Sequence, residues 1–134
     1  MSESDWASLV ANTYELNSHW DTPPALDACD LFYVQMDERH HSVTLGLDAP
    51  LDAEHHEGEQ TPVPNSVEFY LQFTDVERLR VKGWQAPGNK HARLYRHADG
   101  TIRFSADSEG SHLEFAASTC RLVELRARRV FSHD

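Results

Sequence analysis

Strict alternation of apolar and polar residues over positions 67–73 constrains this chain more than any other feature. Every second side chain is apolar, and polar side chains separate them: Val67, Phe69, Leu71 and Phe73 against Glu68, Tyr70 and Gln72. Successive side chains of a strand point to opposite faces, so the pattern predicts a strand with one core face. After a tight connection, Leu79 and Val81 repeat the alternation, and we expect them to continue the core face in a second strand.

Further strands are predicted along the rest of the chain. The run around Leu31–Met36 is apolar on both faces, which favours a central, well-covered strand. Asp99-Gly100 between two alternating segments is a strong hairpin signal. The predicted strands are, approximately, residues 28–36, 42–48, 66–74, 77–84, 92–97, 101–106, 111–117 and 120–130.

The N-terminal residues follow a different period. Trp6, Leu9 and Val10 are spaced as on one face of a helix, and Ser4-Asp5 precedes them as a cap, so we expect a helix over residues 5–17. The predicted class is therefore α+β. One N-terminal helix packs on a curved, mainly antiparallel sheet of seven or eight strands, a meander that can fold into a sandwich. All 134 residues form one domain.

Charge is unevenly distributed along the chain. The formal net charge is −10, and residues 1–75 hold fifteen Asp or Glu but one basic residue, Arg39. Bulk electrostatics therefore argue against nucleic acid as a partner. The acidic N-terminus does not resemble a signal peptide, and no apolar run is long enough to cross a bilayer, so we expect a cytoplasmic protein with no membrane partner. Cys29 and Cys120 are expected to be buried free thiols, and a pairing of the two in the fold stays open as the alternative.

Residues 49–65 are predicted to form a long acidic loop. We take five carboxylates in and beside it as candidate partner-binding residues: Asp48, Asp52, Glu54, Glu57 and Glu59. They could attract a basic protein. The pairs His40-His41 and His55-His56 lack the spacing of a zinc motif, so we predict no metal site and no cofactor.

Strand parity also predicts a basic and aromatic sheet face. If Leu79 and Val81 point inward, the outer face carries Arg78, Arg80, Lys82, Trp84, Tyr70, Arg93, Tyr95 and Arg103. Such a face could stack nucleic-acid bases or cover the N-terminal helix with its aliphatic stems. The chain has neither a Gly-rich phosphate loop nor a nucleophile elbow, so we expect no enzymatic activity.

The order of several motifs resembles the immunity protein 50 family of bacterial polymorphic toxin systems. They are Leu71-x-Phe73-x-Asp75-Val76-x-x-Leu79-x-Val81-x-Gly83-Trp84, the helix with Trp6, Leu45-x-Leu47-Asp48-x-Pro50, and Phe115-x-x-x-x-Cys120. The resemblance implies a cytoplasmic, non-enzymatic protein that binds and neutralises a cognate toxin. Two alternatives stay open: a small-molecule-binding or enzymatic β-barrel-like domain, and a structural or adaptor module. The oligomeric state is open too.

Overall fold

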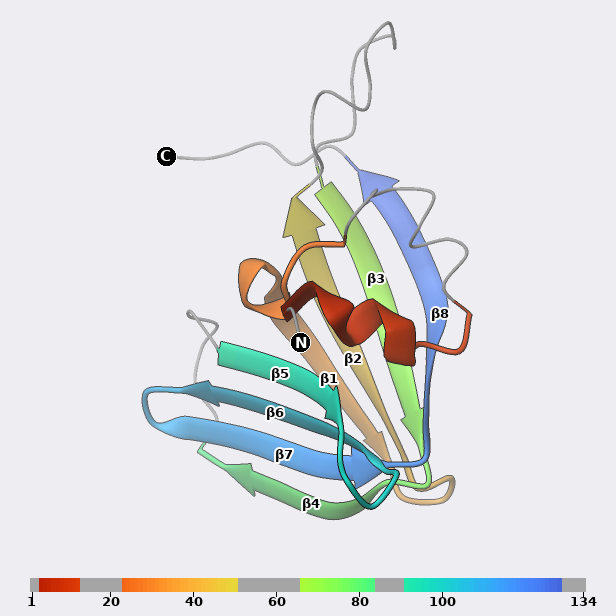
Figure 1. The fold of residues 1–134 in the computed structure, drawn as a ribbon. Coiled ribbons are helices and arrows are strands. Elements are labelled where there is room, and N and C mark those ends of the chain that lie inside the picture. Colours follow the sequence, from red (N-terminus) through yellow and green to blue (C-terminus); the bar gives the residue numbers. More distant parts are fainter. Residues whose placement is uncertain (1–2, 13–22, 51–65, 84–90, 129–134) are drawn as a thin grey trace, which may run out of the picture.

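The computed structural model describes residues 3–12, 23–50, 66–83 and 91–128, which form two four-stranded antiparallel sheets (Figure 1). Two short 3-10 helices precede them, η1 (Glu3–Leu9) and η2 (Leu26–Ala28). The strands are β1 (Asp30–Asp37), β2 (Ser42–Pro50), β3 (Ser66–Thr74), β4 (Glu77–Lys82), β5 (His91–Arg96), β6 (Ile102–Ser108), β7 (Ser111–Ala117) and β8 (Thr119–Arg128).

Sheet A has the strand order β1-β2-β3-β8, and sheet B has the order β4-β7-β6-β5. The chain changes sheets between β3 and β4 and again between β7 and β8, and these two corners touch. Ser118 donates a backbone hydrogen bond to the carbonyl of Thr74 (2.9 Å) and a hydroxyl hydrogen bond to the carboxylate of Asp75 (2.6 Å). Asp75 has a positive φ of 53°, which Asp tolerates better than most residues. The strands of sheet B therefore run across those of sheet A (Figure 1).

The core lies between the inner faces of the two sheets. The alternating apolar residues of β3 are fully buried, as predicted. The ring of Phe73 lies 4.9 Å from that of Phe115 in sheet B, measured between centroids. At the other end of β3, Trp6 of η1 stacks on Phe69 at 5.7 Å and donates its indole N–H to the carbonyl of Pro24 (2.8 Å). Helix η1 thus closes the part of the core that sheet B leaves open (Figure 1).

Residues just after η1 occupy the free edge of sheet A. The backbone N–H of Ala11 donates to the carbonyl of Cys120 (2.8 Å). The amide of Asn12 bonds both backbone groups of Leu122, accepting from its N–H and donating to its carbonyl, each at 2.8 Å. These contacts satisfy backbone groups of β8 that would otherwise be open to another chain.

The predicted α+β class is wrong, because the described residues contain strands and 3-10 turns but no α-helix. Glu3–Leu9 is a 3-10 helix, and residues 13–17 of the expected helix lie outside the described residues. The spacing of three between Trp6 and Leu9 fits one face of a 3-10 helix as well as an α-helix. None of the helices in the described ranges is long and apolar enough to span a membrane.

Each of the eight predicted strand ranges overlaps a strand, but two predicted burial patterns are wrong. Strand β1 is an edge strand, not a central one, and Phe32 and Tyr33 are 39% and 40% exposed. Strand β4 is an edge strand of sheet B, where Leu79 and Val81 remain 41% and 44% exposed. Alternation predicts which side chains share a face of a strand. It does not predict whether that face is buried, because an edge strand can extend past the layer that would cover it.

Candidate functional site

The outer face of sheet A carries a cluster of three aromatic side chains, of which Phe32 and Tyr33 are exposed and Tyr70 is half-buried. Tyr70 of β3 makes edge-to-face contacts with Phe32 (5.9 Å between centroids) and Tyr33 (5.7 Å), both from β1. Phe32 and Tyr33 are consecutive, yet both lie on this face. The pairing of β1 with β2 shifts between Leu31 and Tyr33, and this β-bulge at Phe32 turns the extra side chain outward.

Gly46 of β2 forms the floor of this aromatic cluster. It pairs with Tyr33 on one side and Tyr70 on the other, and the three rings fold over the space that a side chain would take. A carbon added at Gly46 would lie 2.8 Å from Cβ of Tyr33 and 2.8 Å from Cε2 of Tyr70. A glycine within a strand often marks such a close approach, so Gly46 makes the cluster possible.

Carboxylates from three strands border the aromatic cluster. Asp48 lies opposite Glu68, and Glu124 lies opposite Tyr70. The hydroxyl of Tyr70 donates to Glu68 (2.7 Å), and this hydrogen bond to a carboxylate is the main cause that raises the pKa of Tyr70 to about 12. Glu124 forms an ion pair with Arg126. The cluster is therefore an apolar centre whose rim carries three carboxylates and Arg126, which also lies opposite Glu68, and Tyr70 stays protonated at neutral pH.

One of the five predicted partner-binding carboxylates belongs to this face. Asp48 is half-buried and accepts a hydrogen bond from the hydroxyl of Ser66 (2.6 Å). The other four, Asp52, Glu54, Glu57 and Glu59, lie outside the described residues, in the segment that connects β2 to β3. The aromatic residues themselves were missed by the sequence reasoning. One signal could have indicated them: the lone glycine in β2, because an isolated glycine within a strand pattern suggests a bulge or a close approach of neighbouring groups.

The face that the aromatic cluster occupies is free of other described elements. Helices η1 and η2 and sheet B all lie toward the opposite, inner face of sheet A (Figure 1).

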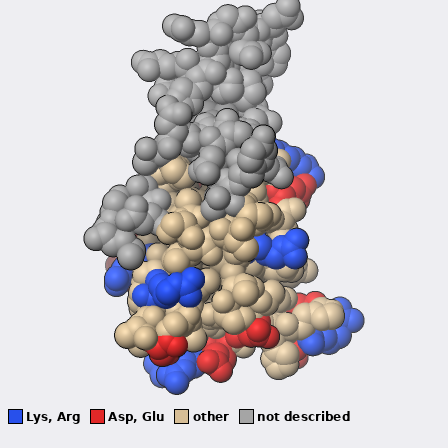
Figure 2. Space-filling model, turned by 45° about the vertical axis from the view of Figure 1, so that its right-hand side comes forward, with Lys and Arg blue, Asp and Glu red and all other residues tan. Residues whose placement is uncertain are grey.

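On the side drawn in Figure 2, charged groups of both signs are scattered over a mostly uncharged described surface. The uneven charge of the sequence therefore does not produce one continuous acidic surface on that side.

The predicted basic and aromatic face is found on sheet B, with corrections. Arg78, Arg80, Tyr95 and Arg103 line one hollow there. Tyr70 does not join them, because β3 belongs to the other sheet, and Trp84 lies outside the described residues. Strand parity predicted correctly that Arg80, Tyr95 and Arg103 share a face, but it failed around the bulge of β4, where Leu79 lines the same hollow as Arg78 and Arg80. It also could not show that the chain changes sheets before β4.

Histidines and cysteines form no obvious reactive centre in the described ranges. No group of three or more His, Cys, Asp or Glu there could hold a metal ion. His40 and His41 are exposed at the β1–β2 turn, and His55-His56 lie outside the described residues. Both cysteines are free thiols: Cys120 is buried, as predicted, and Cys29 is half-buried. Burial raises the pKa of each thiol to about 12, with Asp48 adding to the effect at Cys29.

Comparisons with protein-family models, curated proteins and solved structures gave no match.

Proposed function

We propose that this chain is a non-enzymatic immunity protein that binds and neutralises a cognate bacterial toxin in the cytoplasm, through the outer face of sheet A. The observation that carries the proposal is the aromatic cluster of exposed Phe32 and Tyr33 with half-buried Tyr70, bordered by carboxylates. The resemblance to immunity protein 50 supplies the toxin as the partner class, and the surface supplies a physical means of binding it.

An aromatic centre with a polar rim suits a protein partner. Tyr and Phe are enriched at the centres of protein interfaces, where they bury a large area at low entropic cost. The cluster is already ordered by ring contacts and by the bond from Tyr70 to Glu68, so little side-chain freedom remains to be lost on binding. A contact made by a sheet face also leaves the paired strands unchanged.

The carboxylates of this rim favour a basic toxin surface. Asp48 and Glu68 lie beside the cluster, and the acidic segment with Glu54, Glu57 and Glu59 joins the same two strands in the sequence. Opposite charge on the partner would raise the association rate at low salt more than it would raise affinity. Replacing Glu54, Glu57 and Glu59 with Lys should therefore slow association, and an on-rate that does not change at low salt would remove that role.

Co-expression with a toxin tests the proposal. The toxic C-terminal domain encoded beside this gene should arrest growth, and the wild-type chain should restore it. Phe32→Ser should lose this protection, whereas Val81→Ser, an equally exposed apolar position on sheet B, should keep it. If the wild-type chain neither protects cells nor binds the domain, the immunity function is wrong. If both variants protect equally, the function stands but the surface is wrong.

A further inference from the structure

The outer face of sheet B collects basic side chains from three strands. The strand register places two rows of outward residues next to each other. One row runs Arg80, Glu114, Ser105 and Arg93, and the next runs Glu77, Ala116, Arg103 and Tyr95. The small residues Ser105 and Ala116 lie in the middle of these rows, and the long side chains stand on either side. A hollow of about 360 Å³ lies over the sheet. Five of these eight residues line it, Arg80, Glu114, Ser105, Arg103 and Tyr95, together with Arg78, Leu79, Phe104 and Phe115.

The hollow is positively charged within a strongly acidic protein. Its charged lining residues are Arg78, Arg80, Arg103 and Glu114, which gives a formal charge of +2, and the ion pair of Arg103 with Asp99 offsets one of these charges. The whole chain carries −10. Bulk charge therefore repels anions, and any anion that binds here must be held by these local groups.

Two of the arginines have unused hydrogen-bond donors. Arg80 approaches Glu114 at 3.9 Å, which is beyond hydrogen-bond distance. Arg78 makes no hydrogen bond or ion pair to any residue in the described ranges, and it has a positive φ of 58° in the β-bulge between Glu77 and Arg80. A bulge re-aims a side chain, and a positive φ is a strained conformation for arginine. The local backbone thus presents the guanidinium of Arg78 at the rim of the hollow.

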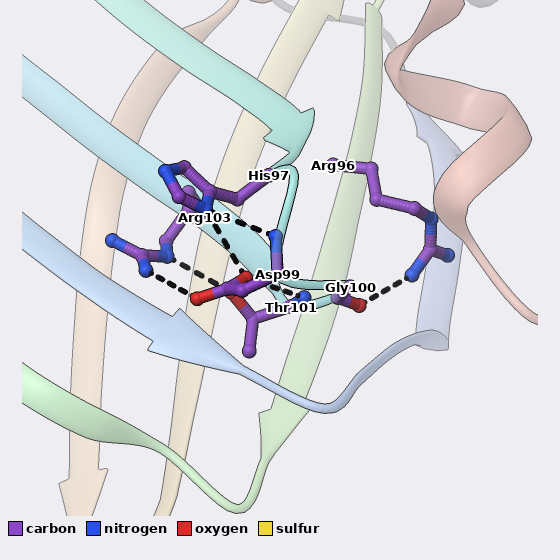
Figure 3. A network of polar contacts seen from close by, with 6 residues as sticks. All are labelled: Arg96, His97, Asp99, Gly100, Thr101 and Arg103. Atoms are coloured by element: carbon purple, nitrogen blue, oxygen red, sulfur yellow. Dashed lines mark hydrogen bonds and ion pairs between the residues drawn. The ribbon is translucent and has the colours of Figure 1, made fainter.

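Arg103 is oriented by the β5–β6 turn (Figure 3). Its Nε donates to the hydroxyl of Thr101 (2.9 Å), and one terminal nitrogen donates to the carboxylate of Asp99 (2.9 Å). Asp99 is itself fixed, because it accepts hydrogen bonds from the backbone and hydroxyl of Thr101. Guanidinium has five N–H donors, so Arg103 is held in place and keeps donors for a ligand.

We propose that this hollow binds a phosphate group as its dianion, with Arg78, Arg80 and Arg103 as its donors. Three guanidinium groups and one carboxylate line the hollow, and the planar guanidinium fork fits two oxygens of a phosphate at once. The hydroxyls of Ser105 and Tyr95 add donors at the wall. Glu114 lowers affinity by repulsion, and its Oε1 lies 3.1 Å from Nε2 of His112. The site is independent of toxin binding, since it lies on the other sheet.

Titration with inorganic phosphate and with phenyl phosphate at low ionic strength tests this site. The wild-type protein should bind at least one of them saturably, with a dissociation constant below about 1 mM. Tighter binding of phenyl phosphate would identify an organic monoester as the ligand class, and equal binding would identify the free anion. Absence of saturable binding of both would overturn the proposal.

Variants locate the binding. Arg78→Ala and Arg80→Ala should each weaken phosphate binding about tenfold, through lost charge-assisted hydrogen bonds. Glu114→Gln should strengthen it about fivefold by removing the repelling charge. Arg121→Ala removes an exposed arginine from sheet A and is the matched control. Equal loss in Arg78→Ala and Arg121→Ala, with both proteins folded by circular dichroism, would show a general charge effect and contradict the site.

Discussion

Replacement of Gly46 by alanine should destabilise the protein and disorder its aromatic cluster. The new Cβ would lie 2.8 Å from Cβ of Tyr33, 2.8 Å from Cε2 of Tyr70 and 3.0 Å from Cζ of Phe32. Ordinary contacts between such carbons are about 3.5–4.0 Å, so each is short by roughly half an ångström or more. The two rings can rotate away, but Cβ of Tyr33 is fixed to the backbone of β1, and the strands must shift.

The size of the effect follows from two opposing terms. Overpacking of this kind costs about 1–3 kcal/mol. Replacing a glycine within a strand by alanine stabilises the folded protein by about 0.5–1 kcal/mol, because alanine loses less backbone entropy on folding. The free energy of unfolding should therefore fall by roughly 1–2 kcal/mol, which lowers the melting temperature by about 3–10 °C for a chain of this length. In a Tyr70→Ala background, one of the three close contacts is gone and the loss should be smaller.

Urea denaturation and near-ultraviolet circular dichroism measure this effect. Gly46→Ala should change the tyrosine signal as well as the stability. Gly100→Ala is the control, because its added carbon meets nothing within 4 Å, although its φ of +90° makes the substitution strained. That control should lower stability without changing the tyrosine signal. Unchanged or increased stability of Gly46→Ala would refute the account of the cluster.

Three other predictions concern the rest of the fold. Asn12→Ala should lower the free energy of unfolding by about 1–2 kcal/mol, because two backbone groups of β8 lose their partner; urea denaturation measures it. Hydrogen bonds to Asp107 and Glu114 raise the pKa of His112 above 6.5. Protonated His112 therefore stabilises the folded protein fully below pH 6.5, and this contribution is lost as the pH rises through the raised pKa. His112→Gln should lower the free energy of unfolding more at about pH 5.5 than at about pH 8.5. Cys120 should react with a thiol reagent only at the rate of unfolding, and fast labelling of the folded protein would contradict its burial.

The strands were predictable from the sequence, whereas their division into two sheets was not. Alternation depends on side-chain direction alone, and it identified β3 and its buried face. The change of sheet depends on the corner, where Asp75 takes a positive φ and Ser118 bonds to it from a distant part of the chain. Contacts between residues so far apart leave no periodic signal, so a single curved sheet and two crossed sheets look alike in the sequence.

The candidate surface was only partly predictable for a related reason. Asp48 was identified because it belongs to an acidic run. Phe32 and Tyr33 were assigned to a covered strand, because an apolar run alone does not tell an edge strand from a central one. Their exposure results from the bulge and from the position of β1 at the sheet edge. Residues exposed at a surface thus have the same appearance in sequence as residues of a core.

The central claim is that the outer face of sheet A binds the toxin, and the affinity of one matched pair of variants tests it most directly. Tyr33→Ala removes an aromatic side chain from the cluster, and Val81→Ala removes a similarly exposed apolar group from sheet B. Titration calorimetry with the purified toxin domain should show Tyr33→Ala binding at least about tenfold more weakly than wild type and Val81→Ala binding like wild type. Wild-type affinity of a folded Tyr33→Ala variant would contradict the claim.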